Sequence, residues 1–184
     1  IKKLNYSGLM EMEFIVADSC SLILLAKCGL LGILSGHFSV LIPQAVFNEV
    51  VNKDTIKKFE DAKIISSLVS EKKVRVVNVK MADQKLPISI DRGEMEALLL
   101  AKQTANSTLA TDDGKAIKVC RYLNLPFIIS PKIAIELYRL GMIDFTKSRS
   151  SIEKMRIIGR YSPEIIAEAI LELEVIKHVK TSNG

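Results

Sequence analysis

The sequence predicts an α/β fold in which a mostly parallel sheet of about five strands lies between two layers of helices. Short apolar runs alternate with longer amphipathic segments along most of the chain, and this alternation is typical of a parallel sheet with helices on both faces. Turn and capping residues fall between the two kinds of segment. The 184 residues, of which 48% are hydrophobic and 26% charged, are enough for one domain with a sizeable core.

The strands are expected in five short apolar runs: residues 14–17, 38–42, 74–79, 107–110 and 126–130. The first run, FIVA, and the fourth, STLA, are short and apolar, as buried strands are. In the third run, VRVVNV, β-branched residues dominate. In a parallel α/β sheet, ligands collect at the carboxyl ends of the strands, so residues directly after these runs are the first candidates for a functional site.

The helices are expected between and after these runs: residues 19–34, 43–52, 54–70, 92–104, 113–124, 131–140, 145–158 and 163–178. Ser19 or Ser21 can cap the first helix, and Pro43 suits the first position of the second. Asp91 can cap the pattern RGEMEALLLAKQT, and Gly141 follows the helix that Pro131 begins. We therefore expect a helical segment after every strand.

Three segments are expected along the chain. Residues 1–12 are predicted to be a leader, possibly disordered, residues 13–143 an α/β domain, and residues 144–184 a helical extension that packs on the same domain. The leader is too poor in apolar residues for a secretory signal. No apolar run reaches the roughly 18–20 residues that a membrane helix needs, and residues 21–34 are expected to form a buried helix.

Composition narrows the cellular setting and the partners. The chain has three cysteines, an odd number, and no C-x-x-C motif, which indicates free thiols in a cytoplasmic protein rather than a zinc site or a disulfide framework. The net charge of +5 is compatible with a nucleic-acid partner and does not establish one.

Acidic residues occur where the predicted strands end and where the predicted helices begin. They are Asp18 after the first strand, Asp112 and Asp113 after the fourth, Glu49 in the second helix, and Glu94 and Glu96 in the first turns of the helix over 92–104. Each has an ordinary explanation, since carboxylates cap helices and favour their first turns, and Glu49 could lie on the surface. Carboxylates that gather in a buried site need cations, and ligands limited to oxygen favour Mg²⁺ or Mn²⁺.

The ordered set of acids resembles the PIN-domain family, which includes VapC-like toxin ribonucleases. The resemblance covers roughly residues 13–140 and is carried, in order, by VADSCSLILLAK, IPQAVFNEVV, DRGEMEALLLA and TLATDDGKAIKV. It implies a three-layer, Rossmann-like fold and an endoribonuclease that cleaves single-stranded RNA with one or two Mg²⁺ or Mn²⁺ ions. The GEMEA and TDDGKA patterns are closer to a stand-alone prokaryotic subgroup. An antitoxin partner and a homodimer are further expectations from the resemblance.

The resemblance also implies roles for particular residues. The metal-binding, catalytic acids are expected to be Asp18, Glu49, Glu96, Asp112 and Asp113, with auxiliary roles for Ser19 and Glu94. Glu96 is favoured over Glu94 because EALLLA falls where the family has an acid followed by an apolar helix. The cations that follow the paired aspartates can bind phosphate or form a solvated helix face: Lys115, Lys118 and Arg121.

Two other classes of function compete with the ribonuclease. One is a non-catalytic RNA-binding or protein-interaction module on the same fold, which would not need the full set of acids. The other is a different phosphate enzyme on a Rossmann-like sheet. The second is disfavoured because the chain has neither G-x-x-x-x-G-K-[ST] nor G-x-G-x-x-G, and because an aspartate-nucleophile phosphatase needs an acid where Cys20 stands.

Overall fold

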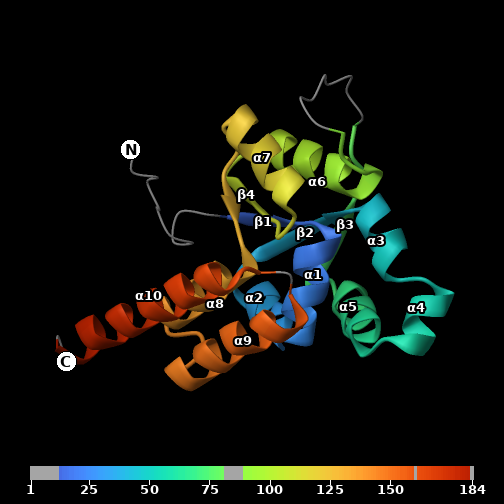
Figure 1. Ribbon diagram of the computed structural model, residues 1–184. Coiled ribbons are helices and arrows are strands. Elements are labelled where there is room, and N and C mark those ends of the chain that lie inside the picture. Colours follow the sequence, from blue (N-terminus) through green and yellow to red (C-terminus); the bar gives the residue numbers. More distant parts are fainter. Residues whose placement is uncertain (1–12, 81–88, 160, 183–184) are drawn as a thin grey trace.

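A five-stranded parallel sheet lies at the centre of the molecule (Figure 1). The computed structural model describes residues 13–80, 89–159 and 161–182, so the predicted leader lies outside the described residues. The strands are β1 (Phe14–Ala17), β2 (Ser39–Pro43), β3 (Val74–Val77), β4 (Ser107–Ala110) and β5 (Phe127–Ile128). Their order in the sheet is β3-β2-β1-β4-β5, and every neighbouring pair is parallel. The predicted fold class is confirmed.

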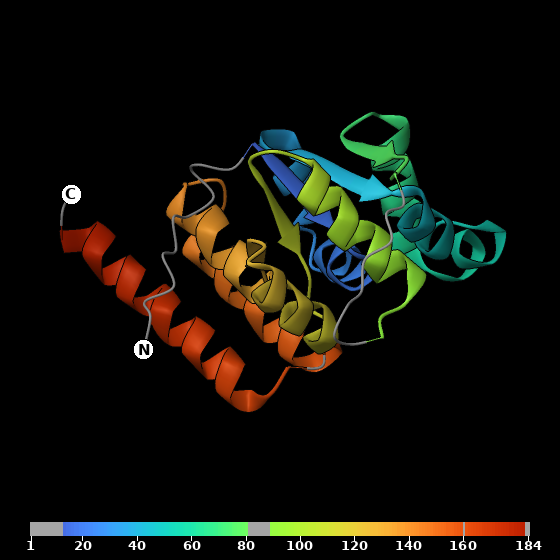
Figure 2. The same ribbon diagram turned by 90° about the horizontal axis from the view of Figure 1, so that it is seen from above.

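Helices cover both faces of the sheet and make three layers (Figure 1, Figure 2). On one face, α6 (Arg92–Gln103) and α7 (Gly114–Leu123) pack on alternate strand residues that include Val16. The other face, which includes Ile15 and Ala17, carries a larger apolar cluster. The helices of that cluster are α1 (Ser19–Lys27), α2 (Leu31–His37), α3 (Gln44–Val50), α5 (Glu60–Ser70), α8 (Ser130–Arg139), α9 (Phe145–Ile158) and α10 (Pro163–Ser182). Because β1 is buried from both sides, its sequence is apolar without alternation.

Two segments that the sequence predicts as single helices are each broken. The predicted helix over 19–34 is divided into α1 and α2, because Gly29 turns the chain with a φ of +66°. The predicted helix over 54–70 is divided into α4 (Lys53–Lys58) and α5, because Phe59 takes an extended conformation between them. Pro43 ends β2 and precedes α3 instead of opening it. The apolar pattern runs through the first break, so it shows the buried face and not the interruption, whereas α4 buries no residue.

The C-terminal helices share the core of the sheet. Ile152 of α9 and Ile166 and Leu173 of α10 belong to the same apolar cluster as Ile15 of β1. The Lys147 side chain of α9 donates to the carbonyl oxygen of Cys28, at 2.9 Å, just after α1 ends. Further ion pairs join α10 to α8 and α9: Lys132–Glu172, Arg139–Glu172 and Arg149–Glu174. These contacts place α9 and α10 against the sheet and its helices, while the predicted division into three segments at residues 12 and 143 stays a prediction.

Within the described residues, no single helix is long and apolar enough to cross a membrane. Taken together, α1 and α2 of the described chain have the length and apolar composition of a membrane span, but their axes are bent by 108°. The leucines of this pair, which include Leu22, Leu25, Leu31 and Leu34, lie in the core of the molecule. The segment over 21–34 is therefore buried, as the sequence predicts, although it forms two helices.

Candidate functional site

The candidate site lies where the sheet changes its direction of growth. Strands β2 and β3 extend the sheet on one side of β1, and β4 and β5 extend it on the other. Such a switch point leaves a crevice at the carboxyl ends of the two central strands. Asp18 directly follows β1, and its backbone N–H donates to the Ala110 carbonyl of β4 at 3.2 Å. Asp112 comes two residues after Ala110, so the two acids lie at the same edge of the sheet.

Asp18 is a buried carboxyl group with one unused oxygen. Its side chain is 2% exposed, and Oδ1 accepts from the Ser21 backbone N–H at 2.8 Å, which caps α1. Oδ2 has no hydrogen-bond partner among the residues that the structure describes. Burial raises the pKa of Asp18 to about 6; the Thr111 side chain and Ser21 oppose this rise, and the charge of Asp112 adds to it. A buried carboxylate with an open oxygen is stabilised by a proton or by a cation.

The adjacent aspartates have different environments. Asp113 caps α7, since its Oδ1 accepts from the backbone N–H groups of Lys115 at 2.7 Å and Ala116 at 3.0 Å. Asp112 instead reaches across to α8, where its Oδ1 accepts from the Ser130 backbone N–H at 2.7 Å and its Oδ2 accepts from the Ser130 hydroxyl. The ordinary explanation as a helix cap therefore accounts for Asp113 and not for Asp112.

Tyr161, which the sequence reasoning missed, also binds Asp112. Its hydroxyl donates to Asp112 Oδ1 from the connection between α9 and α10. Burial and the Asp112 charge raise the pKa of Tyr161, which keeps the hydroxyl protonated as a donor. Burial also raises the pKa of Asp112, while Ser130 and Tyr161 oppose that rise. Gly159 makes room for the ring, because a Cβ there would lie 2.9 Å from Tyr161 Cδ2.

Glu49 is held beside the start of α1. The Ser19 hydroxyl donates to Glu49 Oε2 at 2.6 Å, so the residue next to Asp18 binds an acid of α3. Gly93, in the first turn of α6, lies against the same carboxylate, since a Cβ at Gly93 would be 3.1 Å from Glu49 Oε2. Two predicted site residues, Ser19 and Glu49, are therefore brought together at the edge that holds Asp18.

Glu96 has its oxygens occupied by neighbouring groups. The residue is 5% exposed, and its Oε2 accepts from the Ala45 backbone N–H at 3.1 Å, in the first turn of α3. Its Oε1 accepts from Arg92 Nε at 2.9 Å. Glu96 thus joins the beginnings of α3 and α6, and this arrangement explains why an acid is buried there.

Glu94 lies within the electrostatic field of three other acids, which are Asp113, Asp91 and Asp18. It forms a capping box with Asp91, in which the Glu94 N–H donates to Asp91 Oδ1 at 2.8 Å and the Asp91 N–H donates back to Glu94 Oε2 at 3.2 Å. Burial raises the pKa of Glu94, and the charges of Asp113, Asp91 and Asp18 raise it further. Its electrostatic environment therefore includes the acids that follow β1 and β4.

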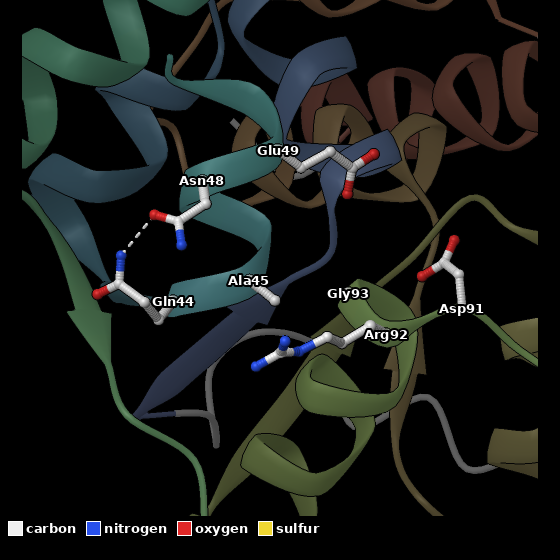
Figure 3. Close-up of a pocket in the computed structure, with 7 residues that line it drawn as sticks. All are labelled: Gln44, Ala45, Asn48, Glu49, Asp91, Arg92 and Gly93. Atoms are coloured by element: carbon white, nitrogen blue, oxygen red, sulfur yellow. Dashed lines mark hydrogen bonds between the residues drawn. The ribbon is translucent and has the colours of Figure 1, made fainter.

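A pocket opens between the beginnings of α3 and α6 (Figure 3). Its volume is about 510 Å³. The residues that line it are Gln44, Ala45, Asn48, Glu49, Asp91, Arg92 and Gly93. Because Glu49 is shared, the pocket adjoins the acidic edge of the sheet.

The donor chemistry of this edge fits a hard divalent cation. Its candidate ligands are carboxylates, and Asp18 Oδ2 is buried and without a partner among the described residues. Over residues 13–80, 89–159 and 161–182, no three His, Cys, Asp or Glu side chains lie close enough to hold one ion together. A shared ion therefore requires rotation of side chains around Asp18.

The predicted phosphate-binding cations lie on one helix next to this edge. Lys115, Lys118 and Arg121 of α7 are exposed. The guanidinium group of Arg121 lies 5.8 Å from the centre of the Phe127 ring. The α7 helix begins directly after Asp113, so its first turn carries Lys115 close to the end of β4.

A comparison with known protein families identifies the chain. A family model described as a PIN domain matches residues 14–174, which includes α9 and most of α10. No curated protein matches the chain. Because the model covers most of the sequence, the chain belongs to the PIN-domain family. PIN domains are generally nucleases and typically use divalent metal ions, so this is a nuclease-type fold.

Proposed function

We propose that this PIN-domain protein is a metal-dependent endoribonuclease that hydrolyses phosphodiester bonds of single-stranded RNA. The observation that carries the proposal is the state of Asp18. Its carboxyl group is buried at the switch point of the sheet, and among the described residues its Oδ2 has no partner. A fold keeps such a costly group where a cation compensates it.

The proposed ligands of Mg²⁺ or Mn²⁺ are Asp18, Glu49, Glu94, Asp112 and Asp113. We propose Glu94 in the place that the sequence favours for Glu96, because Glu96 already has a cationic partner in Arg92. Burial raises the pKa of Glu94, and the charges of Asp113 and Asp18 raise it further. When bound, a divalent ion supplies Lewis-acid stabilisation of the charge that develops on a phosphodiester during hydrolysis.

The remaining residues orient the acids and attract the substrate. Ser19 fixes Glu49, and Ser130 and Tyr161 fix Asp112 through charge-assisted hydrogen bonds. Lys115 and Lys118 supply positive charge that draws the phosphates of RNA toward the edge of the sheet. We also propose that the protein is cytoplasmic and acts as the toxin of a toxin–antitoxin pair, with an antitoxin as its partner. A homodimer is a further proposal.

The proposal is tested with a labelled single-stranded RNA in Mn²⁺ and in EDTA. We expect Mn²⁺-dependent cleavage by the wild type and at least about 100-fold slower cleavage by Asp18→Asn, in which a neutral amide replaces the buried charge. The matched control is Asp54→Asn, on exposed α4, which should cleave like the wild type. Equal cleavage by Asp18→Asn refutes the assignment. RNA binding by both proteins without any cleavage favours the non-catalytic RNA-binding module.

A further inference from the structure

The pocket between α3 and α6 has two chemically different sides. In Figure 3, the amide side chains of Gln44 and Asn48 lie on one side, and the carboxylates of Glu49 and Asp91 lie on the other. The acidic side is continuous with the proposed catalytic edge, because Glu49 binds Ser19 beside Asp18. A ligand in this pocket would therefore meet uncharged polar groups next to the acids.

The two amides form a paired unit on α3. Gln44 and Asn48 are one turn apart, and Gln44 Nε2 donates to Asn48 Oδ1 at 2.8 Å. This bond leaves the Gln44 carbonyl oxygen as an acceptor and the Asn48 amino group as a donor, with no further hydrogen bonds to these two atoms among the described residues. The Watson–Crick edge of every nucleobase offers a donor and an acceptor side by side, and Asn and Gln amides pair with such edges.

Arg92 provides a positive charge at the same pocket. Its side chain is 82% exposed, and Nε donates to Glu96 Oε1 at 2.9 Å. Glu96 is itself fixed by the Ala45 N–H, so the guanidinium group is held by a buried anchor. Within the described chain, no hydrogen bond uses the terminal amino groups of Arg92. A guanidinium group whose two terminal amino groups are open suits a phosphate.

Size and backbone shape also suit a single nucleotide. A volume of about 510 Å³ falls within the usual range for small-ligand pockets, which is roughly 300–1,000 Å³. Gly93 keeps the floor of the pocket open toward Glu49, since a Cβ there would lie 3.1 Å from Glu49 Oε2 and 3.7 Å from Val46 Cγ2. A side chain at position 93 would press against the Glu49 carboxylate and narrow the pocket.

We propose that this pocket is the base-recognition subsite for the nucleotide next to the cleaved phosphodiester bond. Gln44 and Asn48 bind the edge of one unpaired base, and Arg92 binds a phosphate of the same strand. This inference rests on the proposed ribonuclease function, since it places the nucleotide beside the proposed catalytic acids through their shared residue Glu49. It also assigns Glu96 as a positioning residue that holds Arg92 and the start of α3.

Two measurements test the subsite. In the first, cleavage sites are mapped on a randomised single-stranded RNA for the wild type, Asn48→Leu and Gln103→Leu. The control replaces an exposed amide at the far end of α6. We expect the wild type to prefer particular bases at one position beside the cut, Asn48→Leu to lose roughly tenfold of that preference, and Gln103→Leu to retain it. Unchanged base preference in Asn48→Leu overturns the subsite.

The second measurement is the affinity of each of the four nucleoside monophosphates for the wild type, Asn48→Leu, Gln103→Leu and Arg92→Gln. Binding is measured by NMR or calorimetry in the absence of metal. We expect Asn48→Leu to weaken binding of the preferred nucleotide and Arg92→Gln to weaken binding of all four. If the wild type cleaves no RNA, the proposed function fails, while this assay still decides the pocket. Equal affinities of Asn48→Leu and the wild type for all four nucleotides overturn the inference.

Discussion

At the scale of single residues, Asp18 makes the stability of the protein depend on pH. Its pKa is raised to about 6, whereas an ordinary aspartate has a value of 3.8. Between these values the folded state binds a proton that the unfolded state has lost, so stability falls as pH rises through this window. By pH 7, in the absence of metal, the buried charge costs about 3 kcal/mol.

Asp18→Asn removes this cost and keeps the cap of α1, since Asn caps helices as well as Asp does. In urea denaturation with EDTA, we expect the variant to be more stable than the wild type at pH 7. The difference should shrink as pH falls and vanish near pH 3, below the ordinary aspartate pKa of 3.8, where the wild-type carboxyl group is protonated in both states. A difference that stays constant from pH 4 to pH 7 would contradict the assigned pKa.

Tyr161 supports Asp112 through one hydroxyl group, and Tyr161→Phe removes only that group. We expect a loss of about 1.5–3 kcal/mol in the free energy of unfolding, which is typical of a hydrogen bond to a charged group. Tyr122→Phe is the matched control, because Tyr122 is 65% exposed and should change stability by less than about 0.5 kcal/mol. Equal stability of the two variants in chemical denaturation would remove Tyr161 from the site.

These residues also show what the sequence could and could not predict. The sequence predicts Asp18 and Asp112 as site residues because they stand just after apolar strands, and strand ends of a parallel sheet converge. Tyr161 lies 49 positions beyond its partner, and no local pattern links the two. The proposed exchange of Glu94 for Glu96 depends on the partners of the two side chains, which are Asp91 for Glu94 and Ala45 and Arg92 for Glu96, and the sequence pattern does not specify these partners.

At the scale of elements, α7 carries the positive charge next to the paired aspartates. Lys115 and Lys118 are exposed and one turn apart, so they present their charges together. We expect Lys118→Ala to weaken binding of single-stranded RNA and to reduce the slope of log K against log salt concentration by about 0.7. Lys63→Ala on α5 replaces an exposed lysine that pairs with Glu60, and it should leave the slope unchanged. Equal slopes for all three proteins would exclude α7 from the RNA path.

The start of a helix is predictable from the sequence where a capping residue marks it. Asp91 caps α6 and Asp113 caps α7, as the sequence predicts. The break at Gly29 does not show in the apolar pattern, because residues of both α1 and α2 face the core. At Phe59 the reason differs, since α4 buries no residue and the break separates an exposed helix from α5.

At the scale of the whole molecule, the C-terminal helices and the sheet share one apolar cluster. Leu173 of α10 is fully buried in it, so Leu173→Ala should destabilise the entire molecule by about 2–5 kcal/mol. Leu171→Ala, on the exposed side of the same helix, should have little effect. We expect a single unfolding transition for both variants by circular dichroism and tyrosine emission. A separate early transition in Leu173→Ala would show that the extension unfolds independently.

The measurement that tests the account most directly is thermal unfolding of the wild type and Asp18→Asn at pH 7 in EDTA, Mg²⁺ and Mn²⁺. An ion that binds only the native state raises the midpoint of thermal unfolding by mass action. We expect Mn²⁺ or Mg²⁺ to raise the midpoint of the wild type and to leave that of Asp18→Asn unchanged. Metal-independent midpoints for the wild type, or an equal rise in both proteins, would contradict a cation site at Asp18.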